Sequence, residues 1–143
     1  MTISTPFDMT SWVTGPATVL TRTRELVIVS VEFKGIITSN HENKVFDNFI
    51  SHFVGVSRIK DGQVDGRGYF KLTDLDGDFI FTETTAFGPV EKPTWKWKLF
   101  HGTGKWEGIN GEADVSTTTT RIPLEEGTWR AVYRVIGTFE LPK

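Results

Sequence analysis

A histidine, two glutamates and a tyrosine are the residues of this 143-residue sequence whose types and spacing could do chemistry. A His, a Glu and a Tyr that point into an aromatic-lined cavity could supply a general base, a general acid and a hydrogen-bond donor. Desolvation in such a cavity would move the pKa values of His and Glu towards neutrality. We therefore take His101, Glu83, Tyr133 and Glu32 as catalytic candidates for an isomerisation, a cyclisation or an elimination that needs no cofactor.

The stretch from Thr94 onwards is predicted to be a strand that holds the first candidate. Trp95, Trp97, Leu99 and His101 alternate with other residues, so they share one side of the strand. This spacing predicts an aromatic line of ligand-binding residues with His101 near its end. A histidine directly before a turn glycine can also satisfy a backbone carbonyl or face water, and tryptophans in such a line can be plain packing.

The run from Asp78 to Phe87 is predicted to be the strand that carries Glu83. Phe79 and Phe81 precede Glu83 on the same side, so we expect all three to face the interior, with the two phenylalanines against the ligand. If the strand has the opposite orientation, Glu83 faces solvent instead.

The remaining candidates come from three further predicted strands. In the strand from Thr128 to Leu141, Trp129 and Tyr133 share a face, which makes Trp129 a ligand-binding candidate. Tyr133 could equally be a core residue whose hydroxyl finds any partner. Phe53 completes the ligand-binding set. Glu32 lies beside Leu26 and Ile28, which could form an oligomer interface with it.

Many runs of similar length with short turns between them indicate an all-β protein. The predicted strands cover 25–38, 52–59, 68–75, 78–87, a strand from Trp95, 113–121 and 128–141, and a further short strand is expected at Lys105 and Trp106. Asp-Gly pairs at 61–62, 65–66 and 76–77 are typical hairpin turns, and Asn110-Gly111 is a further expected turn. This spacing is typical of an antiparallel barrel or sandwich. We expect a closed barrel because it leaves no long open edge.

Two segments do not fit the strand pattern. Residues 1–20 lack a clear period and are expected to form a loose N-terminal arm anchored by Phe7 and Trp12. Between residues 41 and 54, apolar residues recur at helical spacing behind a possible capping box at Ser39 and Glu42. A short helix is therefore expected there.

Composition excludes several classes of function. The net charge is −2 with both signs interleaved, so no basic surface for nucleic acid is expected. The sequence has no cysteine and its three histidines are scattered, so we expect no metal and no cofactor. No run approaches the length of a membrane span, and no leader is recognisable at the N-terminus. We expect a single cytoplasmic domain over residues 1–143.

Two runs carry a resemblance to a known group of barrels. FVGVSRIKDGQVDGRGYFKL, residues 53–72, and HGTGKWEGINGEADV, residues 101–115, resemble a bacterial branch of the allene-oxide-cyclase-like barrels, of which dirigent proteins are more distant members. The resemblance implies an antiparallel barrel of about eight strands with a central apolar cavity, assembled as a dimer or trimer. Allene oxide cyclases steer the ring closure of a lipid-derived epoxide, and dirigent proteins steer phenoxy-radical coupling. The resemblance does not place a catalytic residue of either group on this sequence.

Three hypotheses for function follow. The first is a cofactor-independent isomerase, cyclase or lyase that acts on a small hydrophobic molecule inside the barrel. The second is a non-catalytic barrel that binds or carries a hydrophobic ligand. The third, weaker hypothesis is sugar binding by surface-exposed Trp95 and Trp97.

Overall fold

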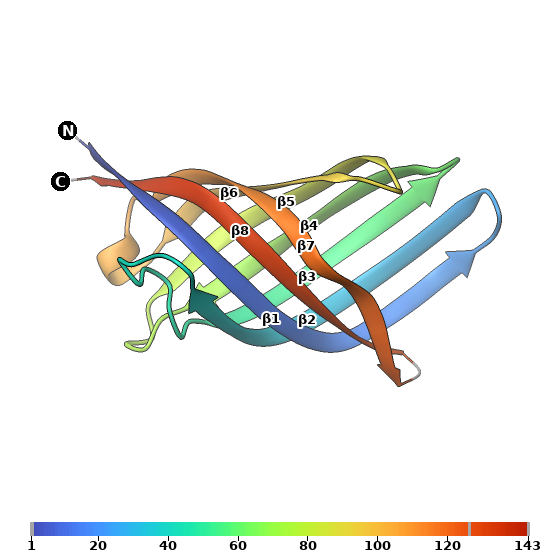
Figure 1. The fold of residues 1–143 in the computed structure, drawn as a ribbon, viewed down its shortest axis with the longest axis horizontal. Coiled ribbons are helices and arrows are strands. Elements are labelled where there is room, and N and C mark those ends of the chain that lie inside the picture. Colours follow the sequence, from blue (N-terminus) through green and yellow to red (C-terminus); the bar gives the residue numbers. More distant parts are fainter. Residues whose placement is uncertain (1, 126, 143) are drawn as a thin grey trace.

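Each stretch of alternating apolar and polar residues forms one strand of a closed antiparallel barrel (Figure 1). The computed structural model describes residues 2–125 and 127–142, and their side chains at 4–117 and 127–142. The strands are β1 (Thr2–Arg22), β2 (Leu26–Ser39), β3 (Ile50–Lys60), β4 (Gln63–Thr73), β5 (Phe79–Pro89), β6 (Thr94–Gly102), β7 (Asn110–Glu125) and β8 (Thr128–Pro142). The described residues contain one short 3₁₀ helix, η1 (Gly104–Trp106), and no helix long and apolar enough to cross a membrane.

Every strand pairs with the next one along the chain, and the barrel closes where β1 pairs with β8. The closing ladder runs from Thr2 opposite Pro142 to Pro16 opposite Thr128. Each strand has a paired neighbour on both sides over part of its length, while β7 beyond Val115 pairs only with β8. Closure removes most of the open edges that a flat sheet would have. The expected closed barrel of about eight antiparallel strands is confirmed.

The N-terminal residues are part of the wall, so the expected loose arm is wrong. β1 pairs with both β2 and β8, and these ladders satisfy its backbone groups over most of its length. Phe7 is buried in the core as expected. Trp12 does not anchor an arm, because its ring lies on the outer wall and its Nε1 donates a hydrogen bond to Thr38 Oγ1 at 3.0 Å.

Residues 40–49 form a closing loop rather than the short helix expected near 41–54. Lys44, Phe46 and Asn48 have φ values of 56°, 68° and 64°, which a right-handed helix does not allow. Phe46 and Phe49 are nevertheless buried, because the loop folds them into the end of the barrel. The apolar spacing therefore reflects a plug of aromatic side chains and not a helical face.

Of the three predicted Asp-Gly turns, two are found at turns and one is not. Asp61 and Gly62 form the expected hairpin turn with φ values of 51° and 78°, and a turn joins β4 to β5 at residues 74–78. Asp65 and Gly66 instead lie inside β4. A Cβ at Gly66 would come within 2.8 Å of the Ser57 hydroxyl oxygen, so this glycine serves close packing and not chain reversal.

The segment after β6 also differs from expectation. Lys105 and Trp106 lie in η1 and not in a short strand, while Asn110 begins β7 and does not form a turn. The Trp106 ring contacts Phe46 at 5.7 Å and Phe49 at 5.8 Å between ring centroids. This helical turn and the closing loop therefore seal one end of the barrel together.

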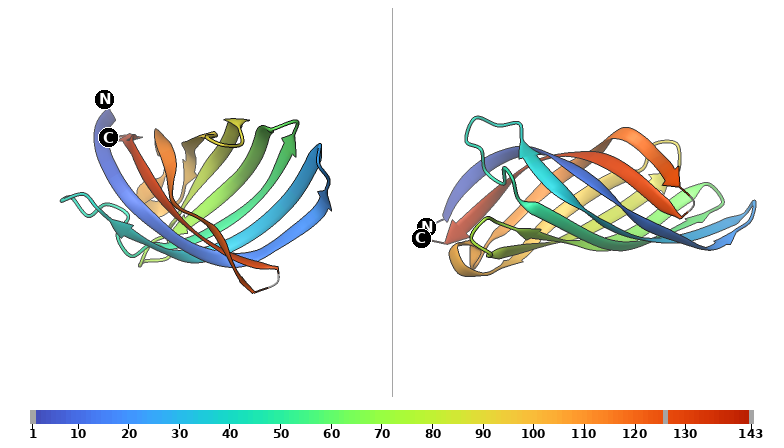
Figure 2. Two further views of the ribbon diagram at one scale, coloured as in Figure 1. Left: turned by 45° about the vertical axis from the view of Figure 1, so that its right-hand side comes forward. Right: turned by 90° about the horizontal axis from the view of Figure 1, so that it is seen from below.

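The two ends of the barrel differ. Figure 2 shows the closing loop (teal) and η1 (orange) at the end where both termini lie. The other end carries the short turns from β1 to β2, from β3 to β4 and from β5 to β6. No aromatic plug of the described residues covers that end, so it is the open mouth of the barrel.

Candidate ligand-binding site

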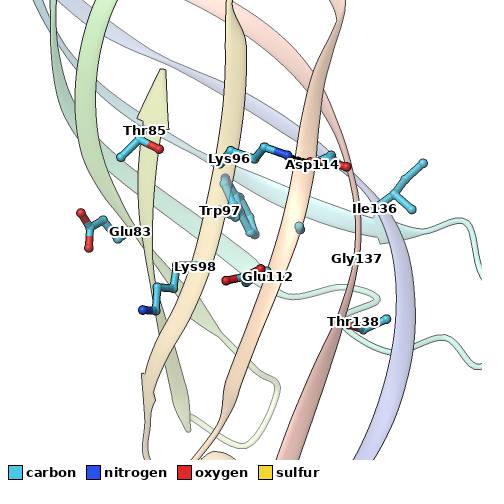
Figure 3. Close-up of a pocket in the computed structure, with 11 residues that line it drawn as sticks. Glu83, Thr85, Lys96, Trp97, Lys98, Glu112, Asp114, Ile136, Gly137 and Thr138 are labelled. Carbon is cyan, nitrogen blue, oxygen red and sulfur yellow. Dashed lines mark hydrogen bonds and ion pairs between the residues drawn. The ribbon is translucent and has the colours of Figure 1, made fainter. Parts of the chain in front are cut away.

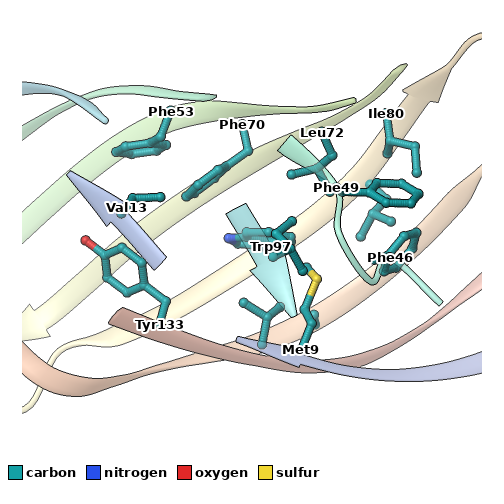
Figure 4. Close-up of a cluster of buried hydrophobic side chains, with 14 of the residues drawn as sticks. Met9, Val13, Phe46, Phe49, Phe53, Phe70, Leu72, Ile80, Trp97 and Tyr133 are labelled. Carbon is teal, nitrogen blue, oxygen red and sulfur yellow. The ribbon is translucent and has the colours of Figure 1, made fainter. Parts of the chain in front are cut away.

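Aromatic side chains from several strands stack in the middle of the barrel (Figure 4). Phe53 of β3 lies 4.4 Å from Phe70 of β4, and Phe70 lies 4.8 Å from Trp97 of β6, between ring centroids. Trp95 lies 5.9 Å from Tyr133 of β8. These rings form flat apolar walls above the closed end.

The mouth pocket opens above these rings. It has a volume of about 680 Å³, which is within the usual range for small-molecule sites. Most of its lining is apolar, with two charged side chains among the residues. The lining consists of Arg22, Val27, Val29, Ser57, Ile59, Val64, Val90, Glu91, Pro93, Trp95, Thr117 and Trp129.

Below the mouth the barrel narrows to an upper and a deep cavity. The upper cavity shares Val29, Ser57 and Trp95 with the mouth pocket, and it shares Trp95 and Thr84 with the deep cavity. Each leaves only about 10 Å³, which is room for about one water molecule. The shared lining shows that the three spaces adjoin one another in a row from the mouth to the middle of the barrel.

Four buried polar atoms in the barrel interior have no partner among the described residues. The side-chain oxygens of Thr82, Thr84 and Tyr133 and the Nε1 of Trp97 are buried and have no hydrogen-bond partner in the described part of the chain. Thr84, Trp97 and Tyr133 line the deep cavity together with Phe53, Phe70, Trp95 and Val115. Buried polar groups in native proteins are normally paired, so these atoms call for an explanation.

No acidic or basic side chain among the described residues turns into the two cavities. Arg67 borders the upper cavity, but its guanidinium points outward to Glu83 at 3.1 Å. The buried carboxylate of Asp74 lies in the turn between β4 and β5 at the closed end. Tyr133 is therefore the one ionisable group in the deep cavity.

Six of the sequence-predicted site residues face the interior. Trp97, Leu99, Phe53 and Tyr133 are buried, and Trp95 lines the mouth pocket and both cavities. Trp129 lines the mouth pocket. The predicted orientation is confirmed for these residues, while their contact with a ligand stays a prediction. Leu99 packs below the cavities and does not line them.

β5 has the opposite orientation to the predicted one. Ile80, Thr82, Thr84 and Ala86 are its inward residues, so Phe79, Phe81 and Glu83 face outward.

Outer-wall partners explain why aromatic residues can lie on the exposed face of β5. The ammonium group of Lys71 lies 3.9 Å above the centre of the Phe79 ring, and the Phe81 ring packs on His101 at 5.9 Å. Glu83 pairs with Arg67, as described above. The predicted interior position of Phe79, Phe81 and Glu83 is therefore wrong.

His101 is turned outward by a β-bulge. Leu99 pairs with Thr82 and His101 pairs with Phe81, which leaves Phe100 as an extra residue in β6. Such an extra residue reverses the alternation beyond it. His101 is consequently exposed although it has the same parity as Trp97 and Leu99, and the predicted interior position is wrong.

Glu32 also lies on the outer wall, where its Oε2 is 2.8 Å from the Nε2 of His52. Both side chains are exposed to solvent to a large extent. The structure therefore does not bring His101, Glu83 and Glu32 together with Tyr133, and only Tyr133 reaches the interior.

Sequence reasoning missed Thr82, Thr84 and Ser57. The signal was present in β5, where Ile80, Thr82, Thr84 and Ala86 form a β-branched or small set that suits a narrow interior. In β4, Gly68 lies opposite Thr84, and a Cβ there would come within 2.6 Å of the Phe53 ring, so this glycine lets that ring pack beside Thr84.

A second hollow, the outer groove, lies on the outside of β5–β8 and has a volume of about 710 Å³ (Figure 3). Its side chains alternate in charge, with Lys96 ion-paired to Asp114 and with Lys98 and Glu112 beside them. The charged groups of the outer groove are solvated, and Lys96 and Asp114 neutralise each other, so they offer little binding energy to a ligand. We therefore take the mouth pocket with its two cavities as the candidate site.

At the closed end, the buried carboxylate of Asp74 accepts several hydrogen bonds. Burial raises the pKa of the Asp74 carboxyl, but hydrogen bonds from Trp106, from backbone N–H groups of Asp78 and Asp76 and from Lys105 outweigh it and hold the pKa at about 2. This carboxylate ties η1 to the turn between β4 and β5.

Comparison with solved structures shows which type of barrel fold this chain has. The chain matches the pterocarpan synthase dirigent proteins GePTS1, with a TM-score of 0.56 over 99% of this chain and 92% of that one, and PsPTS1, with a TM-score of 0.55 over 99% and 95%. Identity is 11% in both cases, so the likeness concerns the fold alone. No protein-family model matches the chain, and no curated protein matches it by sequence.

The fold is thus that of the dirigent-type barrel. The expected relation to a bacterial branch of the allene-oxide-cyclase-like group stays a prediction.

Proposed function

We propose that this chain is a small-molecule-binding barrel that takes a flat apolar ligand through its open mouth. The observation that carries the proposal is the mouth pocket of about 680 Å³ with its mostly apolar lining, which adjoins two small cavities with aromatic walls and with buried polar atoms that have no partner among the described residues. Natural ligand sites combine such walls with a few polar groups that fix orientation. The dirigent-type fold is consistent with this use, since the solved neighbours are described as pterocarpan synthase dirigent proteins.

A cofactor-independent conversion of the bound molecule is the second candidate. Tyr133 favours it, because its buried hydroxyl has no partner and could exchange a proton with a substrate. An isomerisation, cyclisation or elimination would then use this hydroxyl and the shape of the walls. The outward positions of His101, Glu83 and Glu32 leave them no part in it.

We also propose that the chain assembles as a homo-oligomer, as the sequence resemblance implies. An apolar row, defined by Trp12, Ile36 and Ile50, crosses neighbouring strands on the outer wall, where Trp12 pairs with Ile36 and Ile36 with Ile50. Burial of this row against a second copy would remove large apolar side chains from water.

Ligand titrations with blocked-mouth variants test the proposed binding site. Ser57→Phe places a ring in the mouth pocket and the upper cavity, whereas Val54→Phe places the same ring on the outer wall of the same strand. Binding of flat aromatic probes is followed by quenching of tryptophan fluorescence, because Trp95 and Trp129 line the mouth. We expect Ser57→Phe to weaken binding at least about ten-fold, which corresponds to about 1.4 kcal/mol.

The Val54→Phe variant is the matched control and is expected to bind like the unaltered chain. Equal binding by both variants would place the probe on the outer wall and contradict the proposed function. Absence of binding by any flat apolar probe to the unaltered chain would contradict it as well.

A further inference from the structure

Two glycines leave room for one aromatic ring in the middle of the barrel. Gly55 of β3 and Gly68 of β4 are directly opposite each other, and both line the upper cavity. A Cβ at Gly55 would come within 2.5 Å of the Phe53 ring, and a Cβ at Gly68 would come within 2.6 Å of the same ring. The Phe53 ring therefore leans along β3 towards the mouth and lies over both glycines.

This ring lies between the upper and the deep cavity. The side chain of Phe53 lines both cavities, and so do those of Thr84 and Trp95. Phe53 is buried, and its ring lies 4.4 Å from the Phe70 ring between centroids, where Figure 4 shows the two rings side by side. Phe53, Thr84 and Trp95 thus form the partition between the two cavities.

The Phe53 ring accounts for the small size of the two cavities. Each of them holds about one water molecule, whereas the mouth pocket above them has a volume of about 680 Å³. A ring system in the mouth pocket cannot enter either cavity while the Phe53 ring is in place. Without that ring, its own volume and the two cavities would form one space with room for a phenyl group. This space would adjoin the mouth pocket through the lining that the mouth pocket shares with the upper cavity.

We propose that Phe53 is the specificity-determining residue of the barrel, because its ring sets the depth to which a ligand enters from the mouth. This inference rests on the proposed function. It adds that the site favours flat apolar molecules that the mouth pocket accommodates on its own. A longer molecule gains no burial of its far end below the mouth pocket.

Two neutral probes and the Phe53→Ala variant test the inference on the full chain. The probes 2-naphthol and 6-benzyl-2-naphthol share one ring system, and the benzyl group lies at the end away from the hydroxyl, which stays near water. In Phe53→Ala the benzyl group can occupy the place of the removed ring. Isothermal titration calorimetry should then show a preference for 6-benzyl-2-naphthol over 2-naphthol that is at least about ten-fold greater than in the unaltered chain.

Phe139→Ala is the matched control for the loss of a buried ring. Phe139 is also buried, but it lines neither the mouth pocket nor the two cavities. The preference between the two probes should be the same in Phe139→Ala as in the unaltered chain. Phe53→Leu is a milder truncation that takes the place of Phe53→Ala if the latter does not fold, and it should raise the preference by a smaller factor.

A double-mutant cycle checks the position of the ring without any ligand. Gly55→Ala should lower the denaturant midpoint of the unaltered chain, because the added Cβ overlaps the Phe53 ring, while the next nearest residue is Arg67 with its carbonyl oxygen at 3.3 Å. The same substitution in Phe53→Ala or Phe53→Leu should lower the midpoint much less. Additive effects would mean that the ring does not lie over Gly55, and they would overturn the inference.

The outcomes separate this inference from the proposed function. If both probes bind the unaltered chain, lose binding in Ser57→Phe and show an unchanged preference in Phe53→Ala, the barrel binds ligands but Phe53 does not set their depth. An equal rise of the preference in Phe139→Ala and Phe53→Ala would also overturn the inference. If neither probe binds the unaltered chain or the Phe53 variants, the proposed function is wrong and the inference falls with it.

Discussion

The hydroxyl of Thr84 is buried in the apolar interior of the barrel and has no hydrogen-bond partner among the described residues. A binding site can require such a group, but the ligand-free barrel is less stable for it, because an unsatisfied buried hydroxyl costs about 1–3 kcal/mol. Thr84→Val keeps the shape and removes the hydroxyl. We expect the free energy of unfolding to rise by about 1 kcal/mol, as measured by denaturant titration without ligand.

Thr85→Val is the matched control, because Thr85 is the next residue on β5 and faces the outer wall. Its effect should stay within about 0.5 kcal/mol. A loss of stability in Thr84→Val would mean that this hydroxyl is satisfied in the folded barrel.

Asp74 is the residue that should make the barrel sensitive to acid. Its pKa of about 2 in the folded chain lies below the ordinary value of 3.8, so its contribution is complete above pH 3.8 and is lost as the pH falls towards 2. The shift corresponds to about 2 kcal/mol. Asp74→Asn should therefore be less stable than the unaltered chain at pH 7 by about this amount.

Unfolding by denaturant at pH 7, 4 and 2 checks this expectation for Asp74. The difference between the two chains should shrink between pH 4 and pH 2, since protonation removes the same charge in the unaltered chain. Asp65→Asn, which removes an exposed carboxylate that pairs with Arg58 at 3.0 Å, is the surface control and should cost less than about 1 kcal/mol at pH 7. A difference that stays constant down to pH 2 would show that the charge of Asp74 does not stabilise the closed end.

At the scale of the strand, alternation predicts orientation only where the two faces differ in chemistry. In β2, Val29, Val31 and Phe33 alternate with Ser30 and Glu32, and the sequence therefore identifies the inward face correctly. In β5 both faces carry apolar residues, because Phe79 and Phe81 alternate with Ile80 and Thr82. The two faces of β5 differ instead in side-chain size: the inward face carries the smaller side chains, and the outward face carries the phenylalanine rings.

In β6, alternation predicts the orientation of the side chains only in the first part of the strand. Its first half follows the alternation, so Trp97 and Leu99 could be assigned to the interior from the sequence. The extra residue Phe100 depends on how β6 pairs with β5, and no local pattern marks it. His101 therefore lies on the outer wall for a reason that only the pairing of the two strands reveals.

The closing loop should contribute much of the stability of the closed end. Phe46 is buried and contacts Phe7, Phe49, Trp106 and Phe139 through its ring. Phe46→Ala should lower the free energy of unfolding by about 3–5 kcal/mol, the usual range for removal of a buried phenylalanine. Denaturant titration measures this directly.

Phe100→Ala provides the comparison, since that ring lies on the outer wall and is about half exposed. It should cost much less than Phe46→Ala. Similar costs for the two variants would mean that the closing loop is not packed in the barrel as the structure places it.

At the scale of the whole molecule, the sequence predicts the closed barrel better than the site within it. Regular strand lengths and the need to leave no edge were sufficient for the class of fold. The difference between the two ends was not predictable, because it comes from aromatic residues of the closing loop meeting Trp106 across the barrel. Those residues are distant in sequence, and their apolar spacing resembles a helix.

The proposed homo-oligomer leads to a prediction for the whole molecule. Ile36 is the middle residue of the apolar row on the outer wall and is 53% exposed in the single chain. Because most strands of the barrel are paired on both sides, we expect association to use side chains of the outer wall. Sedimentation should give the unaltered chain a mass of two or three times 16.1 kDa.

Ile36→Arg should shift that mass to a single 16.1 kDa chain, since a charge in the middle of a buried apolar contact is costly to desolvate. Ile136→Arg introduces the same charge at a similarly exposed isoleucine beside the outer groove, away from the apolar row, and should leave the mass unchanged. A monomeric unaltered chain at tens of micromolar would contradict the homo-oligomer. Dissociation by Ile136→Arg and not by Ile36→Arg would instead place the contact over the outer groove.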